Sequence, residues 1–198
     1  MKNIELRSAL IDELSETSWQ VTAKNISVIY SFTPESGISV SEMINKIENK
    51  NVQYSRQATS IVPITLAPGG IENERPEFVW HLEKAEISEG VYGGCKVLNL
   101  NVDIESTLYK LYFHVVVFPD VSVIRQWFEV ENTSVSRTDL FFAKPFNADF
   151  KFDDYKSSYY YTWFGGGYTR PDQGLLRSEM IGWNKNYKMH GSQTEEFV

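Results

Sequence analysis

The stretch LYKLYFHVVVFPDVSVIRQWFEVENTSVSRTDL, residues 108–140, decides the fold class of this chain. Over 109–117 every second residue is apolar, and an alternating pattern resumes over 121–130, which is the period of a β-strand. Between these segments Pro119 presets its own φ angle and Asp120 bonds its own backbone, so the dipeptide predicts a turn. The pattern therefore predicts an antiparallel hairpin, with a third strand starting behind it.

The first strand of the hairpin is also largely apolar on its second face, which carries Tyr112, Val116 and Phe118. A strand that is apolar on both faces usually lies centrally and is covered from two sides. We therefore expect the whole hairpin to form the centre of the core. The tryptophans assigned to the core are Trp19, Trp80 and Trp127.

One segment departs from the strand pattern. Ser39 and Glu42 have the spacing of a helix capping box. The apolar residues that follow at helical spacing are Val40, Met43, Ile44 and Ile47. A short helix is predicted at 40–49, while short alternating segments between turn residues recur along the rest of the chain. The fold class predicted is all-β, a large antiparallel supersandwich of two sheets.

Composition limits the partners. The 198 residues include 42% apolar and 14% aromatic ones, enough for a substantial core. A balance of 26 acidic to 19 basic residues, with no basic patch in the sequence, argues against nucleic-acid binding. No apolar run approaches the ~20 residues that span a bilayer, and the N-terminal residues lack the apolar region of a signal peptide. We expect no nucleic-acid or membrane partner; the compartment, cytoplasmic or periplasmic, stays open because a leader could have been trimmed.

The hairpin also carries a likeness to a known family. The residues concerned are Val115, Val117, Phe118, Pro119, Asp120, Val123, Ile124, Arg125, Trp127, Glu129, Val130, Asn132, Thr133, Ser134 and Leu140. In this order they resemble the N-terminal β-sandwich domain of the α-galactosidase and raffinose-synthase family of glycoside hydrolases. Segments 161–165 and 174–191 are similar to the part of that domain that leads into the catalytic barrel, so the likeness covers roughly 75–198.

The resemblance implies both a fold and a role. The family's domain shares its supersandwich fold with the galactose mutarotases, and the family's two catalytic aspartates lie in the barrel that follows. Residues 1–198 would then be a single non-catalytic domain at the N-terminus of a longer α-galactosidase-like glycoside hydrolase, cut before its barrel. It would pack on the barrel of the same parent chain and shape the cleft for the carbohydrate substrate. Association into a homo-oligomer stays open.

Two other function classes stay open as well. A stand-alone mutarotase-like sugar epimerase would need a histidine acid and a carboxylate base in one groove. The histidines of the chain are His81, His114 and His190, and the first two fall within predicted strands, where an imidazole is more often a packed or surface residue. An independent carbohydrate-binding module would need an exposed aromatic platform.

No catalytic residue, metal site or cofactor is predicted. The abundant carboxylates include no pair set apart for glycoside hydrolysis, and three scattered histidines and one cysteine form no ligand cluster. Sugar sites place aromatic rings beneath C–H faces and polar groups at the ring edge, and segment 159–183 has this chemistry. The candidates for a substrate rim or an interdomain contact are Trp163, Phe164, Tyr168, Arg170, Asp172 and Trp183.

Overall fold

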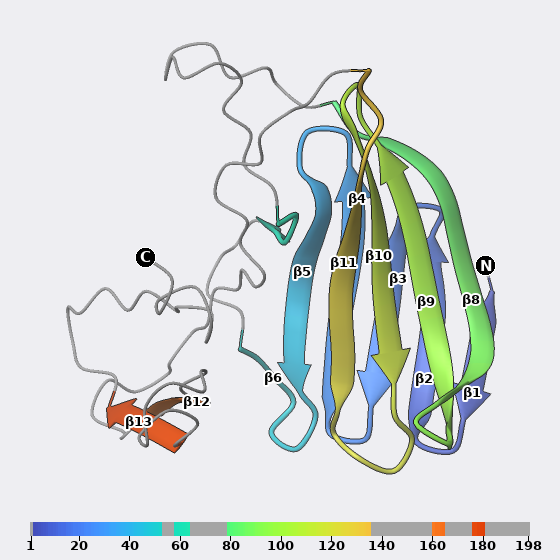
Figure 1. Cartoon of the computed structure of the whole chain (residues 1–198). Helices are drawn as coiled ribbons and strands as arrows, with labels where there is room; N and C mark the ends of the chain where they lie inside the picture. Colours follow the sequence, from blue (N-terminus) through green and yellow to red (C-terminus); the bar gives the residue numbers. More distant parts are fainter. Residues whose placement is uncertain (1, 53–57, 64–78, 136–159, 165–175, 181–198) are drawn as a thin grey trace. The chain divides into compact units, whose positions relative to one another are not determined.

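The structure is a computed structural model that describes residues 2–52, 58–63, 79–135, 160–164 and 176–180 (Figure 1). The chain divides into two compact units, Met1–Lys151 and Phe152–Val198. All regular secondary structure in the described residues is β-strand. The predicted all-β class is confirmed.

The larger sheet of the first unit is an antiparallel meander in which strands β1 to β6 follow one another in sequence order, and β7 pairs with β5. Its strands are β1 (Asn3–Leu6), β2 (Ala9–Ser15), β3 (Ser18–Ala23), β4 (Ile26–Thr33), β5 (Gly37–Asn45), β6 (Lys50–Asn51) and β7 (Thr59–Ser60). Short turns join β1 to β6, so each of these six strands pairs with its neighbour in the chain.

The second sheet has four antiparallel strands in the order β11-β10-β9-β8. They are β8 (His81–Tyr92), β9 (Cys95–Glu105), β10 (Tyr109–Val117) and β11 (Ile124–Asn132). The predicted hairpin is therefore confirmed as β10 and β11. Within the described chain β11 pairs with β10 alone, which makes it an edge strand of this sheet.

The core lies between the two sheets, which lie face to face (Figure 1). Alternate residues of β10 point into it, and the ring of Phe113 meets the ring of Tyr30 from β4 edge-on, with centroids 5.2 Å apart. The Tyr30 hydroxyl donates to Oε1 of Gln126 on β11 over 2.6 Å, so this buried polar atom is satisfied. Burial raises the pKa of Tyr30, which stays neutral inside the sandwich.

The predicted helix at 40–49 is wrong, because this segment is the second half of strand β5 and the turn after it. The strand register explains the error. Val40 pairs with Tyr30 and Met43 pairs with Val28, while the register shifts between Ile29 and Tyr30, so Ser41 is an extra residue. The β-bulge brings Val40 and Met43, three residues apart, to the same face of the sheet and so imitates helical spacing.

The expectation that the three tryptophans lie in the core is confirmed for two of them. Trp19 is 1% exposed and Trp80 is 4% exposed. Trp127 is only half-buried, and it lies on the outer side of the four-stranded sheet, because Phe128 is the residue of that pair that points inward. The hairpin as a whole is likewise not the centre of the core, because only β10 is central.

The described part of the second unit is a single antiparallel hairpin. Its strands are β12 (Tyr160–Phe164) and β13 (Leu176–Met180). The expectation of one domain over 1–198 stays a prediction.

Candidate functional site

The residues predicted for a sugar rim or an interdomain contact lie in the second unit. Trp163 and Phe164 belong to β12, and their register partners on β13 are Arg177 and Leu176. The remaining predicted residues, Tyr168, Arg170, Asp172 and Trp183, fall outside the described residues. The rim hypothesis for this segment stays a prediction.

A second candidate is the outer face of the four-stranded sheet, meaning the face that points away from the larger sheet. Arg125, Trp127 and Glu129 occupy alternate positions of β11, so they share this face. Phe128 points the opposite way and packs on Phe113, with ring centroids 4.7 Å apart. These three residues of the family-like stretch are therefore surface residues.

His114 of β10 lies at the centre of the outer face. Its ring stacks on Trp127, with centroids 4.9 Å apart and planes 23° apart. Nδ1 donates to Oδ1 of Asn101 on β9 over 2.7 Å. Nε2 is buried and lies 3.4 Å from Oε1 of Glu129, in a geometry that makes no hydrogen bond. Side chains from β9 and β11 thus fix the imidazole on both sides.

Arg125 spans the same face from one edge towards the other. From edge strand β11 its guanidinium donates a hydrogen bond to the hydroxyl of Tyr92, at the end of the opposite edge strand β8. The guanidinium carbon of Arg125 lies 4.9 Å from the centroid of the Tyr92 ring. Tyr92 in turn meets Phe118 edge-on. Val97 and Val116 are buried on this face without belonging to the core between the sheets, so we assign their burial to this layer of longer side chains.

Hydrogen-bonded pairs order the rest of the outer face. The Tyr112 hydroxyl donates to Oε2 of Glu131 over 2.6 Å, and this bond raises the pKa of Tyr112 to about 12. Lys84 and Glu86 pair over 2.6 Å, and their hydrogen bond raises the pKa of Lys84 and lowers the pKa of Glu86. Each shift favours the protonation state ordinary at neutral pH, so none of them marks a catalytic acid or base.

The outer face gives little support to proton transfer or to sugar stacking. A histidine acid must reach its substrate, but Nδ1 of His114 is engaged and Nε2 is buried. A stacking platform needs an open ring face, but His114 stacks on Trp127 and the Arg125 guanidinium lies 5.4 Å from the same ring centroid.

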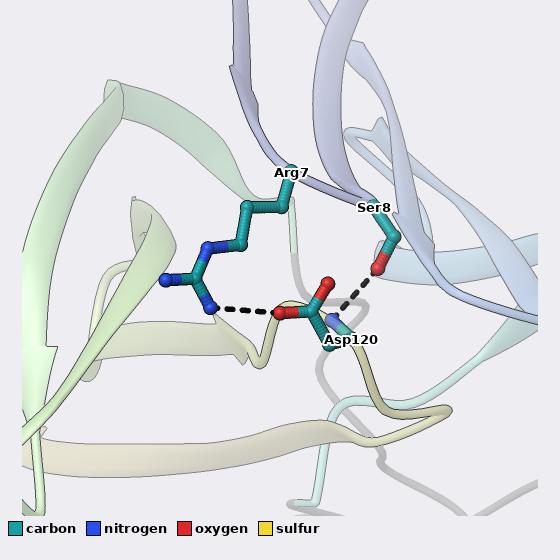
Figure 2. Close-up of polar contacts among 3 residues, drawn as sticks. All are labelled: Arg7, Ser8 and Asp120. Carbon is teal, nitrogen blue, oxygen red and sulfur yellow. Dashed lines mark hydrogen bonds and ion pairs between the residues drawn. The ribbon is translucent and has the colours of Figure 1, made fainter.

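Asp120, a residue of the family-like stretch, forms a clamp between the sheets with Arg7 and Ser8, at the loop after β10 (Figure 2). The Arg7 guanidinium, in the turn between β1 and β2, bonds Oδ2 of Asp120 over 2.8 Å. The backbone N–H of Asp120 donates to the Ser8 hydroxyl over 2.7 Å. Both Arg7 and Asp120 have left-handed backbone, with φ of 57° and 67°. The predicted Pro119-Asp120 turn is confirmed, and it also joins the two sheets.

Within the described ranges no three histidine, cysteine, aspartate or glutamate side chains converge as metal ligands. None of the described residues forms a helix of the length and apolarity that a bilayer crossing requires. Comparison of the chain with protein-family models, curated proteins and solved structures finds no match.

The surface cluster around Trp127 was not predicted, although the sequence contains a signal for it. Trp127 and Phe128 are adjacent in a strand, so they face opposite sides. The positions that share a side with Trp127 are Arg125, Glu129 and Glu131, whereas those that share a side with Phe128 are Ile124, Gln126 and Val130. The charged set identifies the outer face.

Proposed function

We propose that this chain is the non-catalytic β-sandwich domain of an α-galactosidase-like glycoside hydrolase, and that its outer face packs against the catalytic barrel of the parent protein. The observation that carries the proposal is the composition of that face. On β10 and β11 it presents Tyr112, His114, Val116, Arg125 and Trp127 beside the charged Lys110, Glu129 and Glu131.

The face of an antiparallel sheet that only meets water carries mainly polar residues. Here the face carries the apolar Val116, and Trp127 is half-buried and held by His114. Trp, Tyr and Arg are enriched where protein surfaces bind each other, and a side chain already ordered loses less entropy on binding. A third layer of protein over this sheet accounts for both the residue types and their order.

The resemblance of the hairpin to the α-galactosidase and raffinose-synthase family suggests which protein forms this third layer. In the family it resembles, the sandwich precedes a barrel that carries both catalytic aspartates, so the sandwich needs no catalytic group of its own. The second unit would contribute the rim of the sugar cleft through Trp163 and the other rim candidates. A carbohydrate substrate would then meet this chain only at the edge of the site.

The two alternative functions receive less support from the geometry. An epimerase would use His114 with Glu129, but the nitrogen nearest the carboxylate is the buried one. A carbohydrate-binding module would use Trp127 as a platform, but its ring is already stacked. His81 is exposed at the start of β8, where no described side chain bonds it.

The test begins with the coding region beyond codon 198. We expect it to encode alternating strands and helices with paired carboxylates, and we expect that polypeptide, produced separately, to bind this chain. Trp127→Asp should weaken the association by tenfold or more, because a buried aromatic anchor typically contributes ~2 kcal/mol or more. Leu14→Asp, which changes an apolar residue 41% exposed at the end of β2, is the matched control.

Two results would contradict the proposal. One is the absence of a barrel from the parent coding region. The other is hydrolysis of a chromogenic α-galactoside by the purified chain, abolished by substitution of one of its own carboxylates. Equal loss of association with Trp127→Asp and Leu14→Asp would move the barrel contact away from the outer face.

A further inference from the structure

The turns at one end of the first unit form a second surface, separate from the outer face, which we call the loop end. The loop end comprises turns 7–8, 24–25, 46–49 and 93–94 and loop 118–123. All of them lie at the lower end of the sandwich in the view of Figure 1. They lie away from the centre of the outer face, so the proposed barrel contact does not use them.

Hydrogen bonds tie turns 7–8, 24–25 and 46–49 and loop 118–123 into one ordered surface. Besides the clamp between Arg7 and Asp120, the backbone N–H of Lys24 donates to the Val121 carbonyl over 3.4 Å, and that of Lys46 donates to the Asn25 carbonyl over 2.9 Å. The non-glycine residues with left-handed backbone in the described chain are Arg7, Asn49 and Asp120, and all belong to this end. Such backbone persists only where surrounding contacts hold it, so the loop end has a fixed shape.

The charge of the loop end is opposite to that of the chain as a whole. The cations in these turns or within two residues of them are Arg7, Lys24, Lys46, Lys50 and Lys96, besides Arg125 of the outer face, whereas the anions are Glu5, Glu48 and Asp120. Glu48 and Asp120 are paired, with Lys50 and Arg7, and Glu5 is exposed. Lys24, Lys46 and Lys96 are exposed and form no ion pair with a described residue. A chain of net charge −7 thus presents a basic surface at one end.

Aliphatic side chains project among these lysines. Ile47 is 74% exposed and Val91 is 72% exposed, and each lies in or beside a different turn. Val121 and Val123 in loop 118–123 are 47% and 49% exposed. An ordered end that combines exposed aliphatic tips with unpaired lysines is the composition that inserts shallowly into an anionic bilayer surface. A protein hot spot would be expected to present exposed aromatic rings instead.

We infer that the loop end docks the protein on an anionic membrane surface. The aliphatic tips enter the boundary between headgroups and acyl chains, while Lys24, Lys46 and Lys96 lie against the lipid phosphates and carboxylates. Such docking needs no membrane-spanning segment. It revises the sequence-based expectation that the chain has no membrane partner.

The experiment is co-sedimentation of the full 198-residue chain with two kinds of vesicle, phosphatidylcholine alone and phosphatidylcholine mixed with phosphatidylserine, at low and high salt. We expect binding to the mixed vesicles only, with a several-fold decrease at high salt, since salt screens exposed charges. The paired variants Lys24→Glu/Lys46→Glu and Val121→Ser/Val123→Ser should each lose most of the binding. The matched control Lys110→Glu/Val130→Ser, which lies towards the opposite end, should keep it.

Circular dichroism before sedimentation confirms that each variant is folded. Absence of binding to the mixed vesicles at low salt would overturn the inference, and so would equal binding to both kinds of vesicle. A third contrary result is equal capture by soluble polyaspartate that Val121→Ser/Val123→Ser does not reduce. That result would assign the loop end to an acidic protein partner instead of a lipid surface.

Discussion

Strands β10 and β11 form one hairpin with similar alternating sequences, yet their surroundings differ. On β10 the inward residues Tyr109, Leu111, Phe113, Val115 and Val117 are at most 1% exposed. On β11 no residue is fully buried, and its last four residues are exposed. The cause is position, because β10 lies between β9 and β11 whereas β11 is an edge strand of the described sheet. Alternation identifies the inward face of a strand, and the place of the strand in the sheet decides how deeply that face is buried.

The largest effect that this comparison predicts is at the centre of β10. Phe113→Ala should lower the free energy of unfolding by ~3–5 kcal/mol, because it removes a fully buried ring and leaves a cavity beside Tyr30 and Phe128. Urea denaturation of the variant and the parent chain measures the loss. Val123→Ala, at a site 49% exposed, is the control and should change stability by less than ~0.5 kcal/mol. A loss below ~1 kcal/mol for Phe113→Ala would mean that β10 is not central.

A smaller effect is expected for the aromatic residue on the partner strand. If Trp127 lay in the core, as the sequence pattern predicts, Trp127→Ala would also lower the free energy of unfolding by ~3–5 kcal/mol. The structure lowers the expectation to about 1–2 kcal/mol, since Trp127 is half-buried and its main partner is the stacked His114 ring.

The same urea measurement tests this prediction. Trp127→Phe keeps an aromatic ring against His114 and should recover most of the loss. If Trp127→Ala destabilises the chain as much as Phe113→Ala does, then a further layer already covers the outer face in the isolated chain.

Much of the fold can be predicted from the local alternation of apolar and polar residues, because antiparallel strands joined by short turns pair with their neighbours in the chain. The clean apolar face of β9 is an example. Its alternate residues Leu98, Leu100, Val102 and Ile104 are all 0% exposed. Pattern fails where pairing adds a residue, as at Ser41, because a β-bulge depends on the neighbouring strand. Register between strands distant in sequence determines such details, and a single strand does not show it.

The candidate site depends on the same kind of information. That His114 is bonded to Asn101 and stacked on Trp127 follows from the register, which places Asn101, His114 and Trp127 in one row across β9, β10 and β11. No spacing within any one strand predicts that row. The clamp between Arg7 and Asp120 joins residues more than a hundred positions apart, and it needs the packing of two sheets.

The smallest predicted effect is a change in the pKa of a tyrosine. It compares Tyr30, inside the sandwich, with Tyr112, on the outer face. Tyr30 has a raised pKa because it is buried, whereas the pKa of Tyr112 is raised to about 12 chiefly by its hydrogen bond to Glu131. The folded value for Tyr112 lies above its ordinary value of 10.0, so this bond is fully present below pH 10.0 and is lost as pH rises through about 12. Glu131→Gln should therefore lower the pKa of Tyr112 towards 10.0 and leave the pKa of Tyr30 unchanged.

Ultraviolet absorbance titration of tyrosinate measures the shift, and subtraction of the Tyr112→Phe titration isolates Tyr112 among the 11 tyrosines. Glu129→Gln is the matched control, because Glu129 contacts His114 instead. An unchanged Tyr112 titration in Glu131→Gln would mean that its pKa is set by burial, and that the outer face is covered as the inner face is.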